Sequence, residues 1–361
     1  MPVYYYANVI YQFSHALPLY EKYKGTYVVK NLKNYYWFKR YLKNTARFGE
    51  KTLFNTPEII VTGKNKLKDL PPGIIIFFAN AIVPEDDYSD FTTIFYEHGS
   101  SDKKYSAGRS EGADKIEKYD YIFLWGEKNR QKITDLDIKI PEEKYIEIGG
   151  FRFDKYLDSE ALKKEQIKRL KIKDTKRKTI LYAPTWRFGK GTLKQFGAYF
   201  AKEITKKYNL IIRPHSHDSF DGQWIYYLSK LKGVKNLYFS QPNAIVQSDI
   251  LFDFAISDLL IGDMSSVVYE YLITKKPIIL VENNYKNRHI MAKELNIYDH
   301  VAKFEEGMDI NKIIEQSFNS EYTKPLISLL NHCFYSVNKS SVDKAISFLN
   351  KIQENTNVKT N

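Results

Sequence analysis

The sequence predicts an α/β protein with two parallel-sheet domains, and two observations carry this prediction. Apolar, β-rich runs alternate with helix-prone segments along most of the chain, a pattern typical of parallel strands connected by helices. The chain is also 361 residues long, which at roughly 150 residues per domain indicates two hydrophobic cores rather than one.

The N-terminal half contains one strand that is apolar throughout and several shorter ones. Gly73–Ala79 is a continuous apolar run of the kind that a sheet buries on both faces. The other predicted strands are Val3–Ala7, Thr26–Val29, Ile59–Thr62, Thr92–Tyr96, Tyr121–Trp125 and Tyr145–Ile148. A charged, helix-prone stretch at residues 151–178 follows and marks the passage between the domains.

The alternation resumes in the C-terminal half. The predicted strands there are Thr179–Ala183, Leu210–Arg213, Asn236–Phe239, Leu259–Ile261 and Pro277–Val281. Helix-prone segments at Gln195–Lys207 and Ile245–Ala255 fill the gaps, and Ile310–Gln353 has apolar residues at helical spacing.

These patterns predict where the domains begin and end. We expect an N-terminal domain at residues 1–160, a linker at 161–178 and a C-terminal domain at 179–361, whose terminal helix either stays there or crosses back to the first domain. Two such domains usually face a central cleft and bind ligand at the carboxyl ends of their strands.

The charge balance favours an anionic partner. Lys and Arg total 55 against 43 Asp and Glu, a net charge of +12, which attracts nucleotides, phosphopolymers, nucleic acid or an acidic membrane face. The most basic stretch, Lys163–Lys178, lacks the interleaved aromatic side chains on which nucleic-acid bases stack. We therefore predict no nucleic-acid partner.

Composition also limits the redox chemistry and the location. The one cysteine, Cys333, excludes an internal disulfide and a cysteine-based metal cluster. No run reaches the ~20 apolar residues that span a bilayer, and no targeting signal is visible. We predict a cytoplasmic protein, at most peripheral on the inner face of the cell membrane.

The strongest local signal is a strand, a tight turn and a helix start around Asp263, Ser265 and Ser266. Asp263 and Ser265 are good helix N-cap residues. A helix N-terminus offers unpaired N–H donors and a partial positive charge, and serine hydroxyls beside them suit a phosphate oxygen. The pattern predicts either a phosphate cradle or an ordinary capped helix.

Two other strand ends carry candidate phosphate ligands. The Arg213 guanidinium can donate to two phosphate oxygens and His215 can donate to another. Thr185 and Arg187 follow the strand Thr179–Ala183, and taken alone they favour a capped turn with a surface arginine over a ligand site. Metal binding by His215 and His217 would need a third ligand, and the sequence offers no recognisable set. We predict neither a metal nor a cofactor.

His98 is the candidate catalytic base. It follows the strand Thr92–Tyr96 and precedes Gly99, which lets a substrate approach the backbone. Imidazole has an ordinary pKa of about 6.5 and can accept a hydroxyl proton at neutral pH. Because adjacent strand side chains point to opposite faces, Glu97 need not orient His98.

In this order, the four segments resemble the CDP-glycerol glycerophosphotransferase family of teichoic-acid and capsule polymerases. The matching segments are His98–Gly99, Tyr182–Arg187, Arg213–His215 and Ser257–Ser266, extended by Tyr269–Leu272 and Lys276–Ile278. The resemblance spans residues 96–281 and is tightest after Thr179.

The resemblance implies a GT-B fold, with an acceptor-side and a nucleotide-binding Rossmann-like domain facing a central cleft. It implies transfer of glycerol phosphate, or a similar polyol phosphate, from a CDP-linked donor to a hydroxyl of a cell-surface glycan or lipid-linked primer, with release of CMP. His98 would deprotonate the acceptor hydroxyl. The donor-binding set that it implies is Arg213, His215, Asp263, Ser265, Ser266, Thr185 and Arg187.

The chain departs from the family pattern in ways that leave the polyol and the acceptor open. Glu97 stands where the family usually has Trp, Ser100–Ser101 where it has Thr-Pro, and Met264 where it has Tyr. Two alternative functions remain: a capsule or surface-polysaccharide glycosyltransferase with a nucleotide-sugar donor, and a basic module that only binds acidic polymer. Release of UDP or GDP would identify the first, and a base at His98 would have no use in the second.

Overall fold

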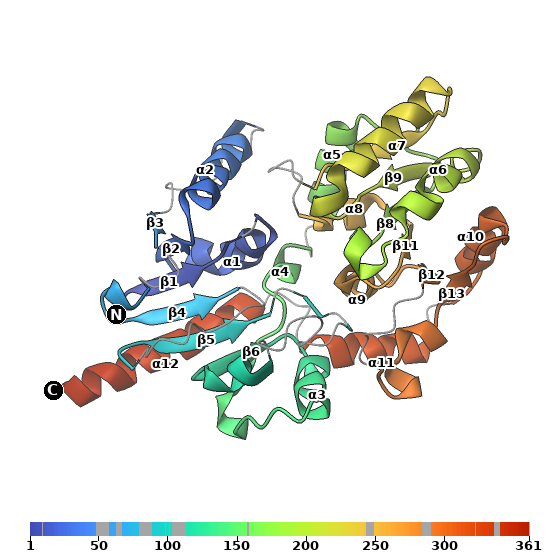
Figure 1. Ribbon diagram of the computed structural model, residues 1–361. Helices are drawn as coiled ribbons and strands as arrows, with labels where there is room; N and C mark the ends of the chain where they lie inside the picture. Colours follow the sequence, from blue (N-terminus) through green and yellow to red (C-terminus); the bar gives the residue numbers. More distant parts are fainter. Residues whose placement is uncertain are drawn as a thin grey trace. The chain divides into compact units, whose positions relative to one another are not determined.

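The computed structural model describes residues 1–8, 10–47, 58–62, 67–78, 89–97, 99–100, 102, 113–156, 159–242, 249–283, 290–321, 323–335 and 340–360. The chain divides into two compact units, unit 1 (residues 1–98, 104–157 and 333–361) and unit 2 (residues 99–103 and 158–332). Each unit contains one parallel sheet with helices packed on it (Figure 1). The predicted α/β class is confirmed.

Unit 1 is built on a sheet with the strand order β3-β2-β1-β4-β5-β6-β7. All its strands are parallel, and the side on which successive strands are added changes between β1 and β4, as in a Rossmann fold. Its elements are β1 (Val3–Tyr6), α1 (Ile10–Lys22), β2 (Thr26–Val29), α2 (Leu32–Arg47), β3 (Ile59–Val61), β4 (Ile74–Phe77), β5 (Thr92–Tyr96), β6 (Tyr121–Leu124), α3 (Glu127–Asp135), β7 (Tyr145–Glu147), α4 (Phe153–Tyr156) and α12 (Ser341–Thr360).

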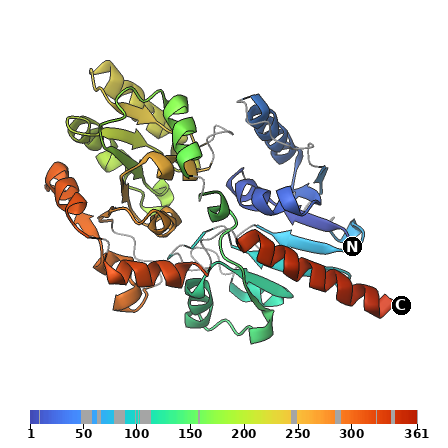
Figure 2. The same ribbon diagram turned by 180° about the vertical axis from the view of Figure 1, so that it is seen from behind.

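The last helix belongs to unit 1, where it packs against β6. Phe348 of α12 packs edge-on against Tyr121 and Phe123 of β6, with ring centroids 4.9 and 5.7 Å apart. Both views show α12, in red, running along the unit 1 sheet (Figures 1 and 2).

Unit 2 repeats this topology with the strand order β10-β9-β8-β11-β12-β13. These strands are also parallel, and the side on which successive strands are added changes between β8 and β11. Its elements are α5 (Ser159–Leu170), β8 (Thr179–Ala183), α6 (Leu193–Ile204), β9 (Asn209–Ile212), α7 (Ser219–Leu231), β10 (Leu237–Phe239), α8 (Leu251–Ile256), β11 (Leu259–Gly262), α9 (Ser266–Tyr271), β12 (Ile278–Val281), β13 (Ala302–Phe304), α10 (Ile310–Phe318) and α11, which begins at Lys324 and ends at Cys333.

The central strands of unit 2 explain the apolar runs in the sequence. Every residue of β8, β9, β11 and β12 is buried, because helices cover both faces of a parallel sheet. Phe200 of α6 and Ile314 of α10 join these strands in one core.

The division into units differs from the predicted boundaries at two places. Residues 161–178, expected as a linker, lie in unit 2 and contain most of α5, which is tied to α8 by a Gln166–Asp253 hydrogen bond of 2.7 Å. Residues 99–103, expected in the N-terminal domain, also belong to unit 2. Residues 333–361 belong to unit 1, so the terminal helix takes the second of the two positions that the prediction left open. One strand, β13, was not predicted, since its three residues include the charged Lys303 and give no apolar run.

Candidate functional site

The candidate donor residues of unit 2 follow the carboxyl ends of three neighbouring strands. Ala183, the last residue of β8, pairs with Gly262, the last residue of β11, and Tyr182 pairs with Ile212 at the end of β9. The loops that follow therefore start side by side at one edge of the sheet. This edge includes the point between β8 and β11 where the strand order reverses, which is the usual ligand position in such sheets.

Asp263 fixes the loop that follows β8. Its Oδ1 accepts a hydrogen bond from the Thr185 backbone N–H (2.7 Å), and its Oδ2 accepts from the Thr192 backbone N–H and hydroxyl (both 3.0 Å). The side chain is buried, with 1% exposure. The structure thus uses both carboxylate oxygens to hold the loop, and the predicted contact of Asp263 with a donor phosphate stays a prediction.

The same network reaches the sheet core through a tyrosine. The Tyr182 hydroxyl lies 2.9 Å from the Thr192 hydroxyl. Burial raises the pKa of Tyr182 well above 10, and the nearby negative charge of Asp263 raises it further. The phenol is therefore a neutral partner that orders Thr192.

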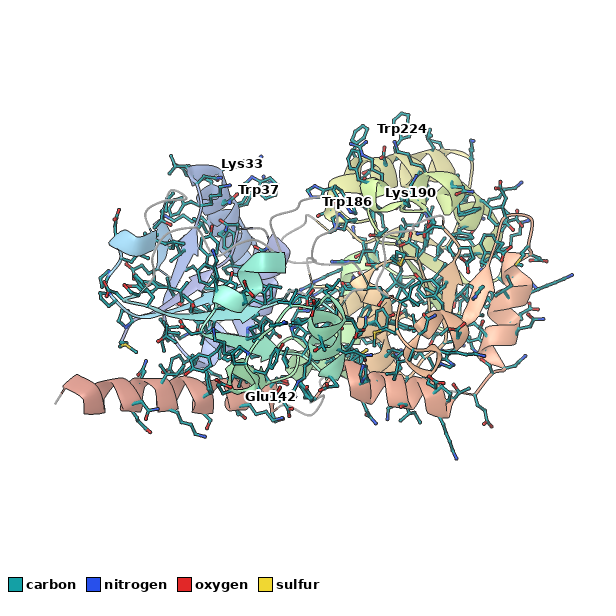
Figure 3. The ribbon with its side chains drawn as sticks, turned by 60° about the horizontal axis from the view of Figure 1, so that its bottom comes forward. Lys33, Trp37, Glu142, Trp186, Lys190 and Trp224 are labelled. Carbon is teal, nitrogen blue, oxygen red and sulfur yellow. The ribbon has the colours of Figure 1, made fainter. Side chains whose placement is uncertain are left out.

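The loop closes so tightly on itself that it requires a glycine. A Cβ added to Gly191 would lie 2.0 Å from the Thr185 carbonyl oxygen, a distance that no side chain tolerates. The Gly191 N–H donates to the Trp186 carbonyl (3.0 Å), and Asn283, after β12, donates to the Lys190 carbonyl (3.1 Å). Trp186 and Lys190 are displayed on this closed loop (Figure 3).

Asp218 ties the loop after β8 to the loop after β9. Its Oδ2 accepts from the Arg187 backbone N–H at 2.7 Å, and its Oδ1 lies 3.9 Å from Arg187 Nε. The Asp218 side chain is 3% exposed, whereas the Arg187 side chain is 55% exposed. Arg187 is thus anchored through its backbone and leaves its guanidinium in solvent, as a ligand for an anion requires. Thr185 is buried beside it, and its contact with a donor stays a prediction.

His215 lies in an aromatic group at the same edge. Its ring centroid is 6.0 Å from that of Trp186 and 5.2 Å from that of His217. Its Nδ1 accepts from the His217 backbone N–H at 3.3 Å, so the neutral ring carries its proton on Nε2. The arrangement gives His215 a fixed orientation.

Ser265 and Ser266 begin α9, next to the residue that follows the candidate base. Ser265 is the N-cap, and its Oγ accepts from the Val267 N–H at 3.4 Å, which leaves its hydroxyl hydrogen to donate elsewhere. Gly99, with φ +151°, packs so closely that an added Cβ would lie 2.9 Å from Ser266 Oγ. His98 itself lies outside the described residues, so its role as a base stays a prediction.

The segment after His98 is also fastened to α9 by a buried hydrogen bond. The Tyr269 hydroxyl donates to Asp102 Oδ2 at 2.6 Å, and both side chains are buried. On the other side of His98, the Glu97 carboxylate is held inside unit 1 by Lys132 Nζ (2.9 Å) and Asn129 Nδ2 (2.8 Å). Both chain neighbours of His98 are therefore anchored, and Glu97 is engaged with α3, while its relation to His98 stays a prediction.

Arg213 occupies a buried position with a carboxylate partner that the sequence did not reveal. Its Nη1 lies 3.0 Å from Asp253 Oδ2 and 3.0 Å from Ser240 Oγ, and Ser240 donates to the same carboxylate oxygen at 2.7 Å. The Arg213 and Asp253 side chains are 7% and 0% exposed. Burial raises the pKa of Asp253, and Arg213 opposes that shift. The contact of Arg213 with a donor pyrophosphate stays a prediction.

Sequence reasoning missed the side chains that organise the site. Asp218, Asp253 and Thr192 each bind a partner that is between 10 and 71 residues away in the sequence. For Asp253 the local signal is an acidic residue inside the otherwise apolar segment Leu251–Ile256, where a charge needs a partner. Among the described residues, no group of three or more His, Cys, Asp or Glu side chains could hold a metal ion.

One family model matches this chain. The model of the CDP-glycerol:poly(glycerophosphate) glycerophosphotransferases matches residues 89–323, about two thirds of the sequence, and contains every candidate site residue. No protein of curated function matches the sequence at a significant level.

Solved structures share the fold at low sequence identity. The wall teichoic acid polymerase TagF is 16% identical with a TM-score of 0.67, and the match covers 98% of this chain and 90% of that one. A TagF variant soaked with CDPG gives 17% and 0.66, covering 98% and 90%. The UDP-GlcNAc 2-epimerase of Neisseria meningitidis, bound to UDP-GlcNAc, gives 13% and 0.61, covering 97% and 100%. The likeness shows a GT-B-type α/β fold.

Proposed function

The chain belongs to the CDP-glycerol:poly(glycerophosphate) glycerophosphotransferase family, and we propose that it binds CDP-glycerol at the carboxyl edge of the unit 2 sheet. The family match confirms the resemblance noted in the sequence, the transferase class and glycerophosphate transfer from CDP-glycerol. The acceptor in our proposal is a hydroxyl of a cell-surface glycan or a lipid-linked primer.

The observation that carries the proposed binding site is the cross-linking of three strand-end loops by buried carboxylates. Asp263 joins the loops after β11 and β8, and Asp218 joins those after β9 and β8. We propose that these ties hold in place the side chains that bind the donor phosphates, which are those of Arg187, His215, Ser265 and Ser266. Preorganised donors stabilise phosphoryl-transfer charge without reorganising during the reaction.

In this reaction the protein has to position the donor and the acceptor and to accept one proton. The acceptor oxygen attacks the phosphorus that carries glycerol, forming a new P–O bond as the P–O bond to CMP breaks, and the electron pair leaves with CMP. We assign the acceptor proton to His98, whose neighbour Gly99 lies against Ser266 at the start of α9. Arg187 and His215 would offset the charge that develops on the departing CMP.

Arg213 and Asp263 act in this proposal mainly by holding the loops. Both side chains are buried and bonded to partners within unit 2. Asp263 is a carboxylate, which would repel a phosphate unless a cation stood between them. We infer that it places Thr185 and the closed loop, and that the exposed Arg187 supplies the positive charge.

The test is a binding and turnover screen with CDP-glycerol, CDP-ribitol, UDP-sugars and GDP-sugars. Selective thermal stabilisation by CDP-glycerol, with CMP released when an acceptor is added, is the expected result. Stabilisation by a sugar nucleotide with release of UDP or GDP would instead make the chain a glycosyltransferase on the same fold and sink the proposal.

A matched pair of variants tests the assigned site. Arg187→Gln should weaken CDP-glycerol binding roughly tenfold or more, since a hydrogen bond to a charged group contributes about 1.5–3 kcal/mol. Arg177→Gln, on a partly exposed arginine at the opposite end of β8, is the control and should leave binding unchanged. Equal effects of the two changes would mean that the carboxyl edge is not the donor site.

A further inference from the structure

Helix α7 of unit 2 has an inward face that packs closely on its own unit. Gly222 lies so near two neighbours that an added Cβ would be 2.6 Å from Pro214 Cγ and 3.1 Å from the Phe239 ring. Ile225 and Tyr226 pack against the core of unit 2. The inward face of the helix therefore already has its hydrophobic partners.

The opposite face of α7 exposes large apolar side chains in a row, which we call the α7 stripe. Residues three, four, seven and eight apart lie on one side of a helix, and Figure 3 shows the Trp224 side chain projecting from this helix. The stripe consists of Phe220, Trp224, Tyr227, Leu228 and Leu231, with exposed fractions of 76%, 59%, 56%, 36% and 83%.

The α7 stripe is large for an apolar surface that remains in water. At about 150–250 Å² for a whole aromatic side chain, its three aromatic residues alone expose roughly 300–500 Å². Contiguous apolar patches larger than a few hundred Å² usually mark an interaction site. Two such stripes packed together, leucines included, would bury on the order of 1,000 Å², the area that a weak but specific interface requires.

The α7 stripe contains no charged side chain. The charged residues of α7 are Asp221 and Lys230, and both are engaged within unit 2. Asp221 forms an ion pair with Lys194 of α6 at 3.3 Å, and Lys230 Nζ lies 5.7 and 5.9 Å from the ring centres of Tyr226 and Tyr238. The stripe is thus a neutral surface on a chain with a net charge of +12, which favours an apolar occupant over an anionic one.

The spacing of the stripe fits pairing with itself. Phe220, Trp224, Tyr227 and Leu231 follow one another at intervals of four, three and four residues, which is the spacing of the seam between paired helices. In an antiparallel pair centred midway between Trp224 and Tyr227, Phe220 is level with Leu231 of the other copy, and Trp224 is level with its Tyr227. Each layer then contains an aromatic ring, and helix ends of opposite dipole lie side by side.

We propose that the α7 stripe is a dimerisation surface, on which α7 of a second copy of this chain packs in antiparallel orientation. A two-fold dimer of this kind uses the same patch on both copies. A lipid bilayer fits the stripe less well, since helices that lie in a membrane interface are rich in lysine and arginine on their polar face, whereas α7 has a single lysine. The dimer is independent of the proposed function, because neither donor nor acceptor takes part in the contact.

The experiment is sedimentation velocity of the full chain without donor or acceptor, at concentrations from about 1 to about 100 µM. We expect a reversible equilibrium between monomer and dimer with a dissociation constant in the micromolar range, since an interface of this area gives weak association. Added salt should not weaken the dimer, because it screens the repulsion between two copies that each have a net charge of +12. A chain that stays monomeric over the whole range overturns the proposal.

A matched pair of double variants tests the surface. Trp224→Ala with Leu231→Ala should raise the dissociation constant at least about tenfold, since both copies lose the two contacts. Leu32→Ala with Trp37→Ala is the control on α2, where the same two residue types are 62% and 47% exposed, and it should stay within about threefold of the parent. The assignment is overturned if both double variants weaken the dimer equally. Because all four side chains are exposed, far-UV circular dichroism should show both variants folded.

Disulfide cross-linking tests the antiparallel orientation. Phe220→Cys mixed with Leu231→Cys should give a cross-linked dimer under mild oxidation, because the two positions are level with each other. Either variant alone should not cross-link, since its two cysteines would lie about 16 Å apart along the helices, beyond the ~7 Å that a disulfide can bridge between Cα atoms. The native Cys333 is buried. Cross-linking of one variant to itself would show a parallel pair and overturn the proposed orientation.

Vesicles distinguish a dimer surface from a lipid contact. The full chain should not co-sediment with phosphatidylcholine vesicles through the α7 stripe. If it stays monomeric and binds these vesicles, and Trp224→Ala with Leu231→Ala abolishes that binding, the stripe is a lipid contact and the dimer is overturned.

Discussion

Replacing Arg213 with methionine distinguishes an arginine that holds the fold from one that grips the donor. In the structure the guanidinium Nη1 lies 3.0 Å from Asp253 Oδ2, and the two side chains are 7% and 0% exposed. Arg213→Met removes the positive charge and leaves the Asp253 carboxylate buried with only Ser240 and Gln166 as hydrogen-bond donors. Breaking a buried pair in this way costs about 3–5 kcal/mol.

The assay is urea unfolding combined with hydrogen exchange of β9 and α8, because a two-unit chain need not unfold in one step. Arg213→Met should lower the free energy of unfolding of unit 2 by about 3–5 kcal/mol. The double variant Arg213→Met with Asp253→Asn should recover at least about 2 kcal/mol of that loss, since no charge is then left unpaired. Arg187→Met, at an exposed position in the adjacent loop, should stay within about 0.5 kcal/mol of the parent.

Calorimetry with CDP-glycerol completes the comparison. Under conditions where the variant is folded, Arg213→Met should bind the donor within a few fold of the parent. The reasoning is refuted if the variant keeps the parent stability and exchange pattern but loses donor binding, because Arg213 would then be a phosphate ligand rather than the partner of Asp253.

The remaining predictions concern the loop ties, the base, the helix start and the alkaline limit. Asp263→Asn should destabilise unit 2 by about 2–3 kcal/mol in urea unfolding. One carboxylate oxygen, which now accepts hydrogen bonds, would be replaced by an NH₂ group that faces N–H or O–H donors of Thr185 or Thr192. Parental stability would contradict the loop-holding role. His98→Ala should lower CMP release by at least about 100-fold with nucleotide affinity within a few fold, and surviving turnover would exclude it as the base. Ser265→Ala with Ser266→Ala should weaken CDP binding about tenfold in calorimetry, and unchanged affinity would exclude their contact with phosphate. The pKa of Tyr182 is raised in the folded state above the ordinary 10, so its stabilising contribution is present below pH 10 and is lost as the pH rises further. In urea unfolding midpoints measured between pH 8 and 11, Tyr182→Phe should therefore lose less stability at alkaline pH than the parent. An identical pH dependence of the two proteins would contradict the assignment.

The part of the chain that the structure describes contains no helix both long and apolar enough to cross a membrane.

The sequence by itself determined the secondary structure and the order of the functional segments. Strands such as Thr26–Val29, Thr92–Tyr96 and Thr179–Ala183 have the bounds that the sequence predicts. Each begins with threonine and continues with β-branched, aliphatic or aromatic residues, as is typical of strands in a parallel sheet that is covered on both faces. The family resemblance was also visible in the chain, since short segments at strand ends carry it. Local periodicity and local motifs depend only on residues that are close together in the sequence.

The tertiary structure alone decided which of these residues face each other. The pairing of Ala183 with Gly262 places Asp263 beside the loop after β8, and Asp253 meets Arg213 from a helix 40 residues further along the chain. The sequence left open where the last helix packs, and the structure places Phe348 against Tyr121 and Phe123 of unit 1. Side-chain partners across such separations depend on register and packing between elements, which no window of sequence contains.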